Sequence, residues 1–287
     1  MPSRNSDAAT EGSAPSSPAR GGDLRTRILS ALVLGPIVLG ITWLGGWPFD
    51  LLILAFALLT TAEWIRLVEP GRSEMAGLMA GAGVVGVLGA LILWGGPGAV
   101  LAVLALTPIL YVAARQAGGA RHPKLIAAVL PYVAGGAAGL AWLRHDPTAG
   151  LGLFLLVLLA VWATDTGAYA AGRLIGGPKL APRISPKKTW AGLIGGMVAS
   201  AVAAWAVALG FQAASPATAA AFGAAIAVVS QGGDLFESWV KRRYGVKDSG
   251  HLIPGHGGLL DRVDGLLVAA PAFALVHAAW EGASPWW

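Results

Sequence analysis

The feature that most constrains this chain is its series of long apolar stretches. Apolar segments of about 17 to 25 residues can cross a hydrocarbon core about 30 Å thick as helices. The chain is 55% hydrophobic and only 12% charged, whereas soluble domains are about 25% charged. The sequence therefore predicts an all-α, polytopic integral membrane protein of about nine transmembrane helices, at residues 28–44, 49–67, 75–94, 99–114, 125–142, 151–175, 190–211, 217–235 and 266–280.

The distribution of basic residues between these spans predicts an orientation. Lys and Arg accumulate on the cytoplasmic side of membrane proteins. A cytoplasmic N-terminus places 19 of the 20 basic residues on the inner side and leaves Arg144 alone outside. Residues 1–24 are rich in Ser, Ala, Pro and Gly, so we expect a disordered cytoplasmic tail. Residues 25–148 and 149–287 then form two transmembrane regions, and the second contains two cytoplasmic motif segments.

Composition also excludes several kinds of chemistry. The chain has no cysteine, so disulfides, thiolate metal ligands and cysteine nucleophiles are excluded. Its net charge is +5, which on so apolar a chain favours anionic lipid headgroups or a phosphorylated substrate. No recognition motif for nucleic acid accompanies this charge, so we expect no nucleic-acid partner.

The first motif segment follows the sixth span and combines glycine, proline and lysine. It contains GGPK at 176–179 and SPKKTW at 185–190. Such a segment can point backbone N–H groups and lysine charges at a polyphosphate, although a plain cytoplasmic loop has the same composition. Asp165 lies just before it, within the span, where a carboxylate usually faces a cavity, a cation or a metal. A buried ion pair with Arg173 is the alternative for Asp165.

The second motif segment contains five carboxylates interleaved with cations and glycines. It reads GGDLFESWVKRR at 232–243, KDSG at 247–250 and PGHGGLLDRVD at 254–264. If the entry to the ninth helix is helical, Asp261 and Asp264 share one face and can bind a hard cation together. Asp234 closes the eighth predicted helix and could meet them. Oxygen ligands without cysteine favour Mg²⁺ over zinc, and we expect His251 and His256 to be hydrogen-bonding loop residues.

The order of these motifs resembles a known family. Between 238 and 264 the chain reads SxVKR, four residues, KDxG and then IPxHGGLxDRVD, which resembles the signature of the phosphatidate cytidylyltransferase (CDP-diacylglycerol synthase) family. GDLxES at 233–238 and SPKKTW at 185–190 are also similar to it, so the resemblance covers roughly the C-terminal half. One departure is Ala191, where many relatives are expected to have glutamate; if that carboxylate assists binding, another residue must replace it here.

The resemblance implies an activity and its partners. It implies transfer of the cytidylyl group of CTP to phosphatidate, with CDP-diacylglycerol and pyrophosphate as products. It also implies a requirement for Mg²⁺, with a second metal ion possible, and a homodimer in the cell (inner or plasma) membrane with its active site on the cytoplasmic face. Because the acyl chains must stay in the lipid bilayer, we expect a cleft that opens sideways between helices.

This hypothesis assigns roles to particular residues. The expected catalytic residues are Asp234, Asp261, Lys188 and Arg262. The expected substrate-binding residues are Ser185, Lys187, Lys188, Lys241, Arg242, Lys247, His256, Gly257 and Gly258. The expected metal ligands are Asp234, Asp261, Asp264 and Asp165.

Two other functions remain open at this point. A CTP-dependent polyprenol or phytol kinase would also need basic loops and Mg²⁺. An ion-coupled transporter can contain broken helices and intramembrane carboxylates, although this chain shows no paired repeat halves and its charges lie on one face.

Overall fold

The computed structural model describes residues 20–280 except 72, 117–119, 251 and 254–256, with side chains described from residue 32 onward except Ser73. Helices dominate this part of the chain, and a single short hairpin interrupts them. The elements are α1 (Arg20–Leu44), α2 (Gly46–Val68), α3 (Ser73–Gln116), α4 (Pro123–Ala127), the π-helix η1 (Leu130–Ala134), α5 (Gly135–Arg144), α6 (Gly150–Leu174), β1 (Lys179–Ala181), β2 (Ser185–Thr189), α7 (Trp190–Gly210), α8 (Pro216–Arg243), the 3₁₀ helix η2 (Leu260–Arg262) and α9 (Asp264–Ala279).

The prediction of a helical, polytopic membrane protein is confirmed. Six helical segments in the described part of the chain are long and apolar enough to cross a bilayer, and two shorter apolar helices accompany them. The six segments are Gly46–Val68, Glu74–Gln116, Pro123–Arg144, Gly150–Leu174, Trp190–Gly210 and Pro216–Arg243. The antiparallel pairing of β1 with β2 was not predicted. Most of the predicted tail lies outside the described residues, and α1 begins at Arg20, a few residues before the predicted end of that tail.

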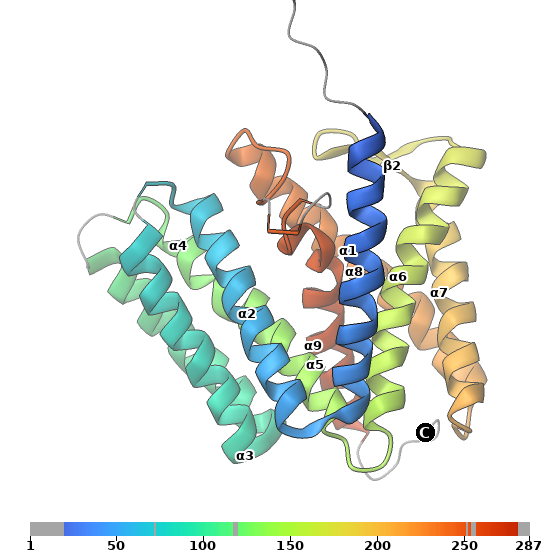
Figure 1. The fold of residues 1–287 in the computed structure, drawn as a ribbon, viewed down its shortest axis with the longest axis horizontal. Helices are drawn as coiled ribbons and strands as arrows, with labels where there is room; N and C mark the ends of the chain where they lie inside the picture. Colours follow the sequence, from blue (N-terminus) through green and yellow to red (C-terminus); the bar gives the residue numbers. More distant parts are fainter. Residues whose placement is uncertain (1–19, 72, 117–119, 251, 254–256, 281–287) are drawn as a thin grey trace, which may run out of the picture.

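Helix α3 consists of two helices joined at a sharp break. Gly95 has φ 68° and ψ −163°, a conformation that a glycine adopts far more easily than other residues. A Cβ on Gly86 would lie 3.0 Å from Cδ1 of Leu106, whereas 20 residues of straight helix span about 30 Å. The two halves therefore fold back on each other (Figure 1), and the break lies between the two spans predicted at 75–94 and 99–114.

Small residues bring the helix backbones close together. A Cβ on Gly167 of α6 would lie 2.7 Å from the carbonyl oxygen of Gly195 in α7. A Cβ on Gly139 of α5 would lie 2.6 Å from the nitrogen of Pro271 in α9. Membrane helices associate by such close contact because lipid supplies no hydrophobic driving force between them.

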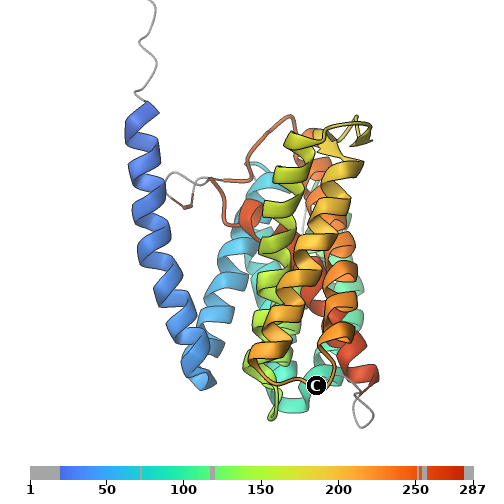
Figure 2. The ribbon, with the colours of Figure 1, turned by 90° about the vertical axis from the view of Figure 1, so that its right-hand side faces the viewer.

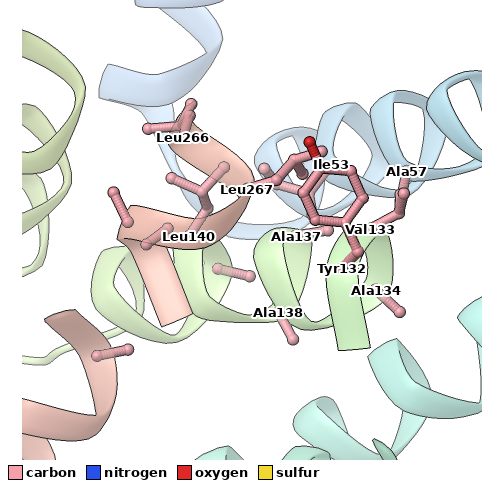
Figure 3. Close-up of a cluster of buried hydrophobic side chains, with 14 of the residues drawn as sticks. Ile53, Ala57, Tyr132, Val133, Ala134, Ala137, Ala138, Leu140, Leu266 and Leu267 are labelled. Carbon is pink, nitrogen blue, oxygen red and sulfur yellow. The ribbon is translucent and has the colours of Figure 1, made fainter. Parts of the chain in front are cut away.

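The centre of the bundle is an apolar cluster between α2, α5 and α9. Figure 3 shows Ile53 of α2, Leu140 of α5 and Leu267 of α9 within this cluster, and all three are buried. Tyr132 of η1 belongs to the same cluster. The cluster joins the first predicted transmembrane region to the last helix of the second.

The polar segments gather at one end of the bundle. The start of α1, the hairpin, the end of α8 and η2 all lie at the upper end in Figure 1. Figure 2 shows α1 standing apart from the other helices over most of its length. Helix α8 continues to Arg243, beyond the predicted end at residue 235, because residues 234–243 contain charged side chains but no glycine or proline. The charges end the apolar pattern without ending the helix.

Candidate active site

One group of site residues joins the hairpin to α8. The Nζ atom of Lys188 in β2 lies 2.5 Å from Oδ2 of Asp234 and donates a 2.8 Å hydrogen bond to Oε1 of Gln231. Ser238 donates from its hydroxyl to Oδ1 of Asp234 at 3.2 Å. Gln231, Asp234 and Ser238 lie three and four residues apart and so share one face of α8. Asp234 is therefore an interior residue of α8, and the prediction that it closes the helix is wrong.

The entry to α7 holds Lys188 in place. Thr189 is the N-cap of α7, and its hydroxyl accepts a 3.0 Å hydrogen bond from the Gly192 amide. Successive side chains of a strand point to opposite faces, so Lys188 turns toward α8 while Lys187 is exposed. The two lysines, both expected to bind substrate, therefore differ in their surroundings.

A second group is centred on the buried ammonium of Lys241. Its Nζ atom lies 2.6 Å from Oε2 of Glu237 and 2.7 Å from Oδ1 of Asp261. Asp261 also accepts hydrogen bonds from the backbone amides of Ser249 and Gly258, each at 3.0 Å from Oδ2. Burial disfavours ionisation of Asp261, but its hydrogen bonds with Lys241, Glu237 and Ser249 outweigh this and keep its pKa below the ordinary value. Asp261 thus joins α8 to the loop that follows it.

Asp261 and Asp264 do not lie on one helix, so the condition under which they would share a helix face is not met. Asp261 lies in the single turn of η2, whereas Asp264 begins α9. Between them Val263 has φ −130° and ψ 0°, outside the helical region. Asp264 accepts a 2.8 Å hydrogen bond from the Gly265 amide, and Tyr132 donates to its backbone oxygen at 3.5 Å.

The predicted metal ligands fall into two sets. Asp165, Asp234 and Asp264 lie within electrostatic range of one another and of Lys188. Asp261 belongs to the Lys241 group instead. Within the described ranges, no group of three or more acidic or histidine side chains is spaced to bind one metal ion.

The remaining predicted residues take other positions. Arg242 is exposed and donates a 3.1 Å hydrogen bond to the Val246 carbonyl. Lys247 is also exposed, and Ser185 begins β2. Gly257 has φ 87° and accepts at its carbonyl oxygen from the Ile253 amide at 3.0 Å. His251 and His256 lie outside the described residues. Arg173 donates a 3.1 Å hydrogen bond to the Tyr169 hydroxyl. This partner differs from Asp165, with which an ion pair was considered.

A cavity of about 650 Å³ opens beside these groups, between α1, α2, α5, α6 and α9. Asp165, Asp261 and Arg262 line its polar part, and Arg262 lies within electrostatic range of Asp165. The rest of its wall is almost entirely apolar and includes Phe49 and Phe154. The cavity therefore has a charged part and a large apolar part.

Sequence reasoning missed two residues of the first transmembrane region that reach the site. Glu63 of α2 is 3% exposed, and its Oε2 accepts a 2.8 Å hydrogen bond from the Leu260 amide. Tyr132 is part of a π-helix, an element that often occurs at functional sites. The signal that singled out Asp165, a carboxylate inside an apolar span, applies equally to Glu63.

Together the fold and the site define a class: a polytopic membrane protein with lysine–carboxylate networks beside a cavity that is charged in one part and apolar in the rest. Comparison with known proteins identifies its family. The Cytidylyltransferase family matches residues 25–280, and the chain belongs to this family. It is accordingly a nucleotidyltransferase enzyme.

Named relatives match along nearly the whole chain. A protein of Brucella suis biovar 1 called "Phosphatidate cytidylyltransferase" is 41% identical over 258 residues, which are 89% of this chain and 94% of the relative. A Pseudomonas aeruginosa protein of the same name is 40% identical over 274 residues, or 91% of this chain and 99% of the relative.

Proposed function

We propose that this protein is a phosphatidate cytidylyltransferase that makes CDP-diacylglycerol for phospholipid synthesis. The observation that carries the proposal is the cavity with Asp165, Asp261 and Arg262 on its polar part. Such a space suits an amphiphilic substrate such as phosphatidate: Arg262 can attract the anionic headgroup, and a cation held by nearby carboxylates would offset their repulsion. The names of the two relatives support the same substrate.

In the proposed reaction, a phosphate oxygen of phosphatidate attacks the α-phosphorus of CTP in line. The bond between the α-phosphorus and the oxygen leading to the β-phosphorus breaks, and pyrophosphate leaves with that electron pair. A phosphate monoester has a second pKa near 6 and is mostly dianionic at pH 7, so the attack needs no strong general base. The protein must chiefly overcome repulsion between two anions.

The cations of the site supply part of that stabilisation. Lys188 reaches Asp234 from the hairpin, and Arg262 lines the cavity. We propose that these two side chains contact the phosphates, because fixed cations stabilise charge that develops on transferring phosphoryl groups. Lys241 already holds Glu237 and Asp261, and we assign it to ordering the site.

The chain's carboxylates also fit the Mg²⁺ that the family resemblance implies. Asp165, Asp234 and Asp264 place three carboxylates near Lys188, an excess of negative charge that a cation would offset. Mg²⁺ is usually held by one or two carboxylates together with substrate phosphates, so a complete protein cage is not required. We propose Asp234 and Asp264 as ligands, with Asp165 assisting. When bound, the ion would neutralise phosphate charge.

Asp261 differs from the other predicted ligands. Its Oδ1 is taken by Lys241, and its Oδ2 accepts from two backbone amides. We therefore propose that Asp261 orders the loop between α8 and η2 and fixes Lys241.

We also propose the orientation predicted by the basic residues, with the site on the cytoplasmic face of the plasma or inner membrane. We propose nine crossings for the part of the chain that the structure describes, because the two halves of α3 can cross separately and the shorter apolar helices α1 and α9 can add one crossing each. Water-soluble CTP then approaches from the cytoplasm while acyl chains enter the apolar part of the cavity. A homodimer is proposed on the resemblance alone.

The proposal is tested with purified protein in detergent, CTP, Mg²⁺ and phosphatidate. We expect release of pyrophosphate and a lipid product with the mass of CDP-diacylglycerol. Release of CDP with a phosphorylated lipid would instead identify a kinase. Folded protein that yields neither product would reopen the transporter hypothesis.

A further inference from the structure

Glu63 lies on α2, in the transmembrane region that contains none of the recognisable motifs. Its side chain nevertheless reaches the loop between α8 and η2. Oε2 accepts the hydrogen bond from the Leu260 amide, at the residue just before Asp261. Oε1 is buried and has no hydrogen-bond partner among the described residues. A carboxylate this deeply buried with one oxygen unpaired is costly.

The two glycines of the loop are packed directly against this carboxylate. A Cβ on Gly250 would lie 2.7 Å from Oε1 of Glu63, and a Cβ on Gly258 would lie 3.0 Å from Oε2. Real Cβ atoms essentially never approach a heavy atom more closely than 3.0 Å. Glu63 therefore occupies the space behind the loop, and a Cβ at position 250 would require the Glu63 carboxylate to shift.

The same loop residues hold Asp261 from the other side. Gly258 and Ser249, the residue before Gly250, donate their amides to the Asp261 carboxylate. Asp261 in turn binds Lys241 of α8. A continuous set of contacts thus runs from Glu63 through the loop to Lys241, and it links the first transmembrane region to the polar residues of the second.

We propose that Glu63 is a positioning residue for nucleotidyl transfer: it supports the loop from behind and so sets the place of Asp261 and Lys241. The assignment of a catalytic effect rests on the proposed function, but the effect on the loop does not. Glu63 does not line the cavity, so its action passes through the loop.

The test compares three variants of the full-length protein in detergent. Glu63→Asp shortens the side chain by one methylene and withdraws the carboxylate from the Leu260 amide. Glu63→Gln keeps an oxygen that can accept this hydrogen bond. Glu69→Gln is the matched control, because Glu69, the residue that caps the end of α2, is also a buried carboxylate (1% exposed) that accepts two backbone N–H bonds. These bonds come from Arg121 and His122, in the connection between α3 and α4, rather than from the loop before η2.

Two measurements are made on each variant: kcat for CDP-diacylglycerol formation and amide hydrogen exchange of residues 257–262. We expect Glu63→Asp to lower kcat about 100-fold, the effect of misplacing reacting groups by about 1 Å, and to accelerate exchange in the loop. Glu63→Gln should restore much of the loop protection and part of kcat. Glu69→Gln should leave both at wild-type values.

If residues 257–262 of Glu63→Asp exchange their amide hydrogens as slowly as in the wild-type protein, the proposal is overturned, whatever the activity of the variant. An equal loss of kcat in Glu69→Gln would also overturn it, because the effect would then follow from altering any buried acid of α2 or its C-cap. If the wild-type protein makes no CDP-diacylglycerol, the proposed function fails, and the exchange measurement alone then decides whether Glu63 supports the loop.

Discussion

The Nζ atom of Lys188, in strand β2 of the hairpin, lies 2.5 Å from Oδ2 of Asp234, in the interior of α8. Gln231, one turn earlier on α8, accepts a second hydrogen bond from the same ammonium. This contact brings together residues of the two motif segments and forms the polar centre of the proposed site.

Replacing Lys188 by alanine should lower kcat by about 10²- to 10³-fold, the usual cost of removing a group that stabilises the transition state. Steady-state pyrophosphate release measures this. Lys179→Ala is the matched control, because Lys179 is an exposed lysine of the same hairpin. Equal losses in both variants would show that only the overall charge of the hairpin matters.

Removing Mg²⁺ with a chelator should stop product formation, and adding it back should restore activity. Asp264→Asn should raise the Mg²⁺ concentration needed for half-maximal rate, because it removes one of the carboxylates proposed to hold the ion. A titration of rate against Mg²⁺ for wild-type and variant protein measures the shift. Full activity in the chelator would contradict the proposed metal requirement.

Lys241→Met should destabilise the protein by about 3–5 kcal/mol, because breaking a buried ion pair leaves an uncompensated charge. Both partners, Glu237 and Asp261, would lose their shared ammonium. Thermal unfolding in detergent measures the loss, and Arg243→Met, at an exposed position of the same helix end, is the control. Equal melting temperatures for the two variants would rule out a structural role for Lys241.

Gly258→Ala should inactivate the protein or unfold the loop. The added Cβ would overlap Oγ of Ser249 and would lie 2.9 Å from the Gly250 nitrogen, so the segment that donates to Asp261 must move. Activity and hydrogen exchange of the loop report the change. Gly210→Ala is the control, since nothing lies within 4 Å of the position that its Cβ would take, and it should behave as wild type.

Asp146, in the connection between α5 and α6, should make stability depend on pH. Burial opposes its ionisation, but hydrogen bonds from the Ala149 amide and from the Thr148 hydroxyl and amide outweigh this and lower its pKa. Folding therefore favours the ionised form. The resulting stabilisation is complete above the ordinary Asp pKa of about 3.9 and is lost as the pH falls through the lower pKa of the folded protein.

The free energies of unfolding of wild-type and Asp146→Asn protein, measured from pH 7 downward, test whether this stabilisation is lost in acid. Wild type should be more stable at pH 7, and the difference should disappear in acid. A stability difference that stays constant down to acidic pH would contradict the role of ionised Asp146.

The sequence alone determined the helical membrane class and the two motif segments. A bilayer offers no water to backbone polar groups, so an apolar run of sufficient length must form a helix, and the run is visible in the sequence. The break at Gly95 could also be anticipated from the sequence, because glycine and proline interrupt the apolar pattern at residues 95–98. The extension of α8 could not, because the charged side chains from Asp234 onward end the apolar pattern while the helix continues.

Only the tertiary structure decided which side chains meet. Asp261 and Asp264 would share a face only if the entry to the ninth helix were helical, but the turn at Val263 separates them and Lys241 binds Asp261 instead. Glu63 reaches the loop because α2 packs beside η2, a relationship with no trace in local sequence. Such contacts depend on how helices cross and on where small residues let them approach, whereas a motif records only residue type and spacing along the chain.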